Sequence, residues 1–201
     1  MLADHYEGLR FNAPNDSTID SKGRIYFSDP RYGPRDTMEI DVEGVYRIDA
    51  PGKVIRVLGR EIERANGVLV SPGDKYLYVA DNNNNNRGGA RKLWRFTLRP
   101  DGSASAASRR LIHDWGSGRG PDGVKMNSRG LLFAAAGRNE PHPPFETAAK
   151  KGGVYILTPQ GKLVDFVPIP KDAVSNCAFG GSDGRTLYIT AGGALWSIAT
   201  Q

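Results

Sequence analysis

The chain has 201 residues, of which 39% are hydrophobic and 24% are charged, and its 27 basic against 22 acidic side chains give a formal net charge of +5. This is the composition of a globular chain, and no apolar run approaches the ~18 residues of a membrane span. The single cysteine, Cys177, excludes an internal disulfide framework and a multi-cysteine zinc site. The arginines and lysines are scattered rather than clustered, so we expect neither a nucleic acid nor a membrane as partner.

In chain order, four segments repeat one pattern: an Asn or Asp, a short apolar stretch, a polar turn with glycine, and a second apolar stretch with Tyr or Phe. They are PNDSTIDSKGRIYFSDP from Pro14, ANGVLVSPGDKYLYVADN from Ala65, PDGVKMNSRGLLFAAAG from Pro121 and SNCAFGGSDGRTLYITAGG from Ser175. The side chains alternate with a period of two, as in Leu77 and Val79 against Tyr78 and Ala80. This pattern predicts a β-hairpin in each segment.

A second hairpin is expected after each of the first three. The corresponding segments are GVYRIDAPGKVIRVL from Gly44, KLWRFTLRPDGSASAASRRLI from Lys92 and GVYILTPQGKLVDFVPIP from Gly153. Two hairpins in a unit of about 50 residues make the four strands of one propeller blade. We therefore predict an all-β fold, a single partial β-propeller over residues 1–201, with blades at about 14–64, 65–120, 121–174 and 175–201. It would hold three complete blades and part of a fourth. A β-sandwich is the alternative, but it does not require such a repeat.

One position recurs at the start of each unit, spaced by 51, 56 and 54 residues: Asn15, Asn66, Asp122 and Asn176. The innermost strands of a propeller line its channel, so these side chains would converge there. Carboxylate and amide oxygens suit a hard divalent cation. Asn-Gly and Asp-Gly are also ordinary turn pairs, but separate Gly-containing turns follow in each unit. For Asn176 a packing role is favoured, because the next residues, Cys177 and Ala178, are small and apolar.

The ordered motifs PNDSTIDSKGRIYFSDPRYG, ANGVLVSPGDKYLYVADN, GPDGVKMNSRG and NCAFGGSDGRTLYIT resemble the gluconolactonase/regucalcin (senescence marker protein) family of six-bladed propellers. The resemblance runs from about Glu7 to Ile198. It implies a divalent metal at the channel and hydrolysis of sugar lactones or related esters. By matched motif, it implies that Asn66 and Asp122 are metal ligands and that Asn15 lies beside the metal and contacts the substrate, or the metal through water. It also implies that Asp29 borders the substrate pocket.

The chain departs from the family pattern in one respect. The family's first-blade glutamate ligand, in an EGP-like segment, has no match, and the comparison implies that about two blades are absent on the N-terminal side. We expect an open propeller to self-associate through its exposed sheet edges and to bind its cation less tightly. A native start at Met1 would indicate the cytoplasm, whereas a missing N-terminal part could carry a signal peptide, so the compartment is left unassigned.

The function expected from these features is metal-dependent hydrolysis of a small-molecule lactone or ester. Ca²⁺ is the first candidate, with Zn²⁺, Mg²⁺ and Mn²⁺ as alternatives, and Asp122 is expected both to bind the metal and to orient or deprotonate the attacking water. Two alternatives stay open: an inactive or binding-only propeller, and a phosphotriesterase-like or strictosidine-synthase-like enzyme. The run Asn82–Asn86 and the segment around His142 are expected to be polar loops.

Overall fold

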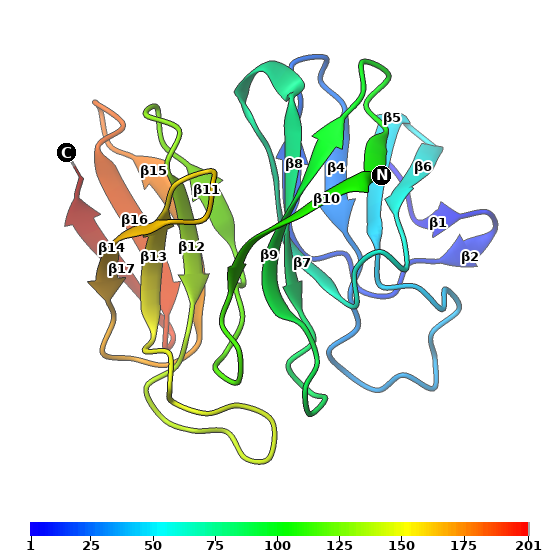
Figure 1. Ribbon diagram of the computed structural model, residues 1–201. Helices are drawn as coiled ribbons and strands as arrows, with labels where there is room; N and C mark the ends of the chain where they lie inside the picture. The colour runs from blue at the N-terminus through cyan, green and yellow to red at the C-terminus, as the bar shows by residue number, and fades with distance from the viewer. Residues whose placement is uncertain (201) are drawn as a thin grey trace.

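The computed structural model describes residues 1–200 and consists of antiparallel sheets arranged side by side (Figure 1). In each of the four main sheets the strands pair in chain order. The first sheet comprises β3 (Ser17–Ile19), β4 (Ile25–Ser28), β5 (Val45–Ala50) and β6 (Lys53–Leu58). The second comprises β7 (Ala65–Val70), β8 (Tyr76–Asn82), β9 (Arg91–Leu98) and β10 (Ala104–Asp114). The third comprises β11 (Val124–Met126), β12 (Leu132–Ala136), β13 (Gly153–Leu157) and β14 (Leu163–Pro168). The fourth comprises β15 (Val174–Gly180), β16 (Thr186–Ala191) and β17 (Ala194–Ala199).

The cores lie between neighbouring sheets, and the period-two pattern of the strands explains why. In β8, Leu77 and Val79 enter the core between the first and second sheets, whereas Tyr78 enters the core between the second and third. In β12, Ala134 faces the second sheet and Phe133 faces the fourth. The central strands β8 and β12 are therefore buried on both faces, as in stacked blades. The prediction of an all-β propeller is confirmed.

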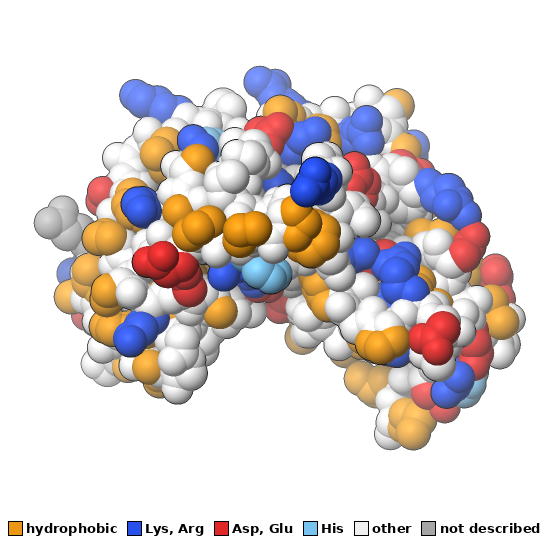
Figure 2. Space-filling view, turned by 90° about the horizontal axis from the view of Figure 1, so that it is seen from below, with side chains coloured by type: hydrophobic (Ala, Val, Ile, Leu, Met, Phe, Trp, Pro, Cys, Tyr) orange, Lys and Arg blue, Asp and Glu red, His pale blue; other side chains and the backbone are white. Residues whose placement is uncertain are grey.

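The inner strands β3, β7, β11 and β15 contact one another in this order. Seen from below, the molecule is an arc with a wide notch between its two ends, rather than a closed ring (Figure 2). One helical turn occurs among residues 1–200, the 3₁₀ segment η1 (Pro72–Asp74), and no helix in this part of the chain is long and apolar enough to cross a membrane.

A short hairpin covers the outward face of the first sheet. It is formed by β1 (His5–Tyr6) and β2 (Leu9–Arg10), which pair only with each other. The ring of Phe11, directly after β2, meets the ring of Phe27 edge-on at 5.1 Å, and Tyr6 meets Tyr46 at 5.2 Å. These aromatic contacts shield apolar surface at this end of the arc.

Two glycines allow the inner strands to approach closely. The N–H of Gly67 donates to the carbonyl of Asp122 (3.0 Å), and a Cβ at Gly67 would lie 2.2 Å from that oxygen. The N–H of Gly123 donates to the carbonyl of Ser175 (2.8 Å), and a Cβ there would lie 2.0 Å from Oδ1 of Asn176. The next blade therefore leaves no room for a side chain at either position, the one after Asn66 or the one after Asp122.

A candidate metal and substrate site at the channel

A cavity of about 430 Å³ opens where the loops of the first three blades meet. Three of the residues predicted from the repeat, Asn15, Asn66 and Asp122, contribute to its wall. The other lining residues are Tyr32, Asn84, Asn85, Arg119, Arg138, His142 and Phe145. One wall therefore offers carboxylate and amide oxygens, and the rest offers mainly N–H donors.

Asn66 has an unsatisfied acceptor. Its side chain is buried, and Nδ2 donates to the hydroxyl oxygen of Tyr32 at 2.7 Å. Its Oδ1 is buried without a hydrogen-bond partner among residues 1–200. Buried polar atoms are usually hydrogen-bonded, directly or through water, and because Asn66 lines the cavity its Oδ1 is available to a ligand or to water there.

Asp122 supplies the carboxylate of the cavity wall, and a main-chain hydrogen bond fixes its backbone. Its N–H donates to the carbonyl of Ala135 (2.8 Å), and its carboxylate accepts a bond from Nη2 of Arg119 (2.9 Å). Burial raises the pKa of Asp122, while the charge of Arg119 and the amide of Asn66 oppose this increase. Its side chain is still 16% exposed, so it remains accessible from the cavity.

Asn15 lies at the exposed rim of the cavity, where its N–H donates to the carbonyl of Ser28 at 3.0 Å. The next residue, Asp16, replaces the glycine found after Asn66 and Asp122. Its carboxylate accepts from the N–H of Val68 (3.2 Å) and pairs with Lys125 (3.6 Å). Asp16 thus links the start of the first blade to β7 and β11.

The donor set of Asn66 and Asp122 fits part of the coordination sphere of a hard divalent cation. The unpartnered amide oxygen and the carboxylate are the ligand types that Ca²⁺ and Mg²⁺ prefer. Among residues 1–200, no three His, Cys, Asp or Glu side chains gather as a metal-binding group. Arg119 and Arg138 add positive charge to the wall. Tight binding therefore requires a further carboxylate besides Asp122.

Several lining residues come from loops and have no counterpart in the repeat. Arg138 pairs with the buried Glu146 (2.8 Å). Arg91 joins the two loops of the rim, because its guanidinium donates to the carbonyls of Gly89 (2.7 Å) and Phe145 (3.2 Å). Asn84, Asn85 and His142 lie in the loops that the sequence predicted, and His142 is exposed as expected. Tyr32 follows the SDP motif, but no periodicity distinguishes it.

Asn176 does not line the cavity. Its Oδ1 accepts from the N–H of Cys177 (2.9 Å), and its side chain packs against Gly123. Cys177 is buried, and its burial raises the pKa of the thiol to about 12. This segment therefore packs the third blade against the fourth.

Asp29, which the resemblance placed at the border of the pocket, is not among the lining residues. It is fully buried, and its carboxylate accepts from the N–H groups of Asn12 (2.9 Å) and Ala13 (2.8 Å). Burial raises its pKa to about 6, against the effect of these two hydrogen bonds. In the structure, Asp29 fixes the segment that leads to Asn15.

This buried acid is expected to make stability depend on pH. Burial raises the pKa of Asp29 from its ordinary value of 3.8 to about 6 in the folded chain, so the folded state keeps this proton to a higher pH. Its contribution to the free energy of unfolding is complete below pH 4 and falls by about 3 kcal/mol as the pH rises through 6. This contribution is measured by urea unfolding of the wild type and of Asp29→Asn at several pH values between 4 and 7. The wild type should lose stability relative to the variant over this range, and a constant difference would contradict the prediction.

Fold and site together define a β-propeller with a polar pocket near its inner strands, and amide and carboxylate oxygens of Asn66 and Asp122 form part of the pocket wall. The chain belongs to the family described as SMP-30/Gluconolactonase/LRE-like region, whose model matches residues 1–193. It is 29% identical over its whole length to a gluconolactonase of Zymomonas mobilis, covering 54% of that protein. It is 30% identical over 94% of its length to a 6-deoxy-6-sulfogluconolactonase of Pseudomonas putida, covering 57% of it.

Solved structures agree with this assignment. The structure of a gluconolactonase from Xanthomonas campestris superposes with a TM-score of 0.78 at 28% identity, over 99% of this chain and 61% of that one. A calcium-binding regucalcin from Agrobacterium tumefaciens shares the fold, with a TM-score of 0.66 at 20% identity, over 88% of this chain and 52% of that one. The chain thus spans little more than half the length of these relatives.

Proposed function

We propose that the protein is a metal-dependent hydrolase of sugar lactones or related esters and that the cavity at Asn66 and Asp122 is its active site. The observation that carries the proposal is the unpartnered, buried Oδ1 of Asn66 in the same cavity wall as the Asp122 carboxylate. The names of the relatives support the lactone as the substrate class. Ca²⁺ is the first candidate for the metal, which the regucalcin neighbour supports.

Asn66 and Asp122 would hold the cation, with Asn15 beside it. A bound divalent cation would supply a Lewis acid that polarises the lactone carbonyl and acidifies water. The raised pKa of Asp122 makes its carboxylate a stronger base than an ordinary aspartate, and it would accept a proton from the attacking water. The water oxygen would bond to the carbonyl carbon, the ring C–O bond would break, and Asp122 would return its proton to the leaving ring oxygen, which gives the open hydroxy acid. Arg119 and Arg138 would donate hydrogen bonds to substrate oxygens, and Asn15 would orient a hydroxyl group.

The proposal is tested by measuring hydrolysis of an aldonolactone after removal of metal with a chelator and after addition of Ca²⁺, Zn²⁺, Mg²⁺ or Mn²⁺. We expect the activity to disappear with the metal and to return with at least one ion. A melting temperature that rises with the same ion would show that binding occurs in the folded chain. Ion binding without turnover would favour a binding-only propeller, and faster turnover of a phosphotriester than of the lactone would favour the phosphotriesterase-like alternative. Either result would overturn the proposal.

A further inference from the structure

We propose that Tyr32 is a positioning residue that determines which end of the Asn66 amide is available to a cation. The inference rests on the proposed function, since it concerns the same metal site. An asparagine can coordinate a cation only through Oδ1, because Nδ2 has no lone pair to offer and carries two protons. The amide group has nearly the same shape in both orientations, so hydrogen bonding must select one of them.

The hydrogen bonds around the Tyr32 hydroxyl make this selection. Its oxygen lies 3.2 Å from the carbonyl of Asn82, which can only accept, so the single phenolic proton is directed there. Toward Asn66 the same oxygen can then act only as an acceptor. It receives a bond from Nδ2 at 2.7 Å, and Oδ1 is left without a partner. The opposite orientation would place two acceptors against each other.

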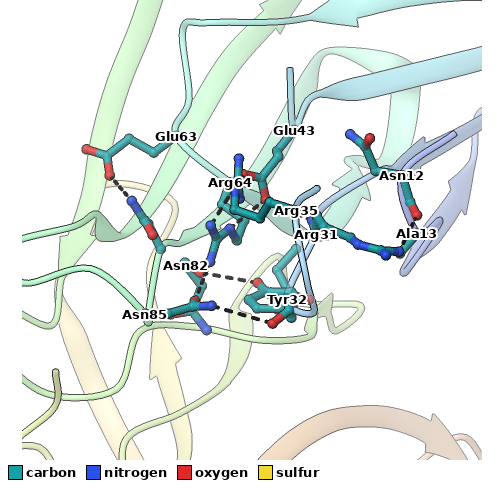
Figure 3. Close-up of polar contacts among 12 residues, drawn as sticks. Asn12, Ala13, Arg31, Tyr32, Arg35, Glu43, Glu63, Arg64, Asn82 and Asn85 are labelled. Carbon is teal, nitrogen blue, oxygen red and sulfur yellow. Dashed lines mark hydrogen bonds and ion pairs between the residues drawn. The ribbon is translucent and has the colours of Figure 1, made fainter. Parts of the chain in front are cut away.

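Tyr32 is itself held in place by a charged network (Figure 3). The guanidinium of Arg64 lies over its ring, with Cζ 5.2 Å from the ring centre. Arg64 is buried and donates through Nε to the carboxylate of Glu43 at 2.6 Å. The carboxylate of Glu43 also accepts from the N–H of Arg31 (2.8 Å), so it fixes the backbone directly before Tyr32. The phenol is therefore oriented by buried contacts outside the cavity wall.

Removal of the hydroxyl should weaken cation binding without removing any ligand. In Tyr32→Phe the amide of Asn66 loses the acceptor that lies 2.7 Å from Nδ2, and only the Asp122 carboxylate still attracts that end, so the amide can turn Nδ2 toward the cation position. Partners that orient metal ligands typically contribute about tenfold to affinity. We therefore expect the dissociation constant for Mn²⁺ to rise by about tenfold.

The experiment measures Mn²⁺ binding to the full chain by calorimetry, for the wild type, Tyr32→Phe and the matched control Tyr46→Phe. Tyr46 is a buried tyrosine of the first blade whose hydroxyl has no hydrogen-bond partner among residues 1–200, and it does not line the cavity. We expect the control to bind like the wild type. Circular dichroism and melting curves would show that each variant is folded.

A second comparison separates orientation of the amide from general support of the fold. In the Asn66→Asp background both ends of the side chain carry oxygen, so adding Tyr32→Phe should leave the Mn²⁺ affinity unchanged. An equal loss in both backgrounds, or wild-type affinity in Tyr32→Phe, would overturn the role of Tyr32. Failure of the wild type to bind any of the divalent ions would instead overturn the proposed metal site, so the two failures are distinguishable.

Discussion

Replacement of Asp122 by asparagine is expected to lower kcat/KM for lactone hydrolysis by about 10²- to 10³-fold, the scale of losing one essential charge-stabilising group in an active site. The variant keeps the shape of the side chain but loses the negative charge that would hold a cation and accept a proton from water. The main-chain bonds of residue 122 to Ala135 and Gly67 do not involve the carboxylate, so the backbone should keep its course. The measurement is initial rate against lactone concentration at a saturating level of the activating ion.

The matched control is Asp165→Asn. Asp165 lies exposed on the outer strand β14, and among residues 1–200 its carboxylate accepts only from the N–H of Phe166, at 2.8 Å. Its substitution should leave the rate unchanged. Because Arg119 loses its charged partner in Asp122→Asn, the melting temperature must be compared as well. A folded Asp122→Asn protein that keeps more than a third of the wild-type rate would contradict a catalytic or metal-binding role.

The largest effect on stability is expected at Glu43, outside the cavity. Its side chain is 5% exposed and pairs with Arg64, which is 3% exposed, and with Arg35. Glu43→Ala leaves the guanidinium of Arg64 buried without its counter-charge. Removal of one partner from a buried pair destabilises a protein by about 3–5 kcal/mol. Urea denaturation at neutral pH should show a loss of about 3 kcal/mol in the free energy of unfolding.

The nearby pair of Asp41 and Arg60 provides the control. Both side chains are about three-quarters exposed, at 77% and 75%. Exposed pairs are screened by water and contribute little, so Asp41→Ala should change stability by no more than about 0.5 kcal/mol. Equal effects of Glu43→Ala and Asp41→Ala would show that burial of the Glu43 pair has no energetic importance.

The fold could be predicted from the sequence because the blade is a local unit repeated along the chain. The alternation in β8 and β12 reflects burial of both faces of a strand, which is visible in a window of a few residues. The open arc agrees with the partial propeller predicted from the number of repeats and the family resemblance. The aromatic cover formed by Tyr6 and Phe11 was not predicted, since it depends on how one short hairpin turns back onto a sheet.

The site was predictable only where it follows the repeat. Asn15, Asn66 and Asp122 share one phase of the blade, and the structure brings them to one cavity. Tyr32 and Arg119 reach the same cavity from connecting segments, whose paths depend on tertiary contacts rather than on periodicity. Asp29 shows the opposite case. It follows a strand near the channel, but its carboxylate binds two backbone N–H groups and does not reach the cavity.

The hydrogen bond between Gly67 and Asp122 joins the main chains of two blades directly beside the two proposed ligands. The spacing of these ligands is therefore set by the framework of the inner strands, whereas Asn84, Asn85, Arg138 and His142 come from the rim loops. Loop sequences can diverge without moving the framework, since they share no main-chain hydrogen bond with residues 66 or 122. Under the proposed function, substrate preference and the reacting centre would therefore be under separate structural control, an arrangement in which one scaffold can acquire new specificities while its chemistry is preserved.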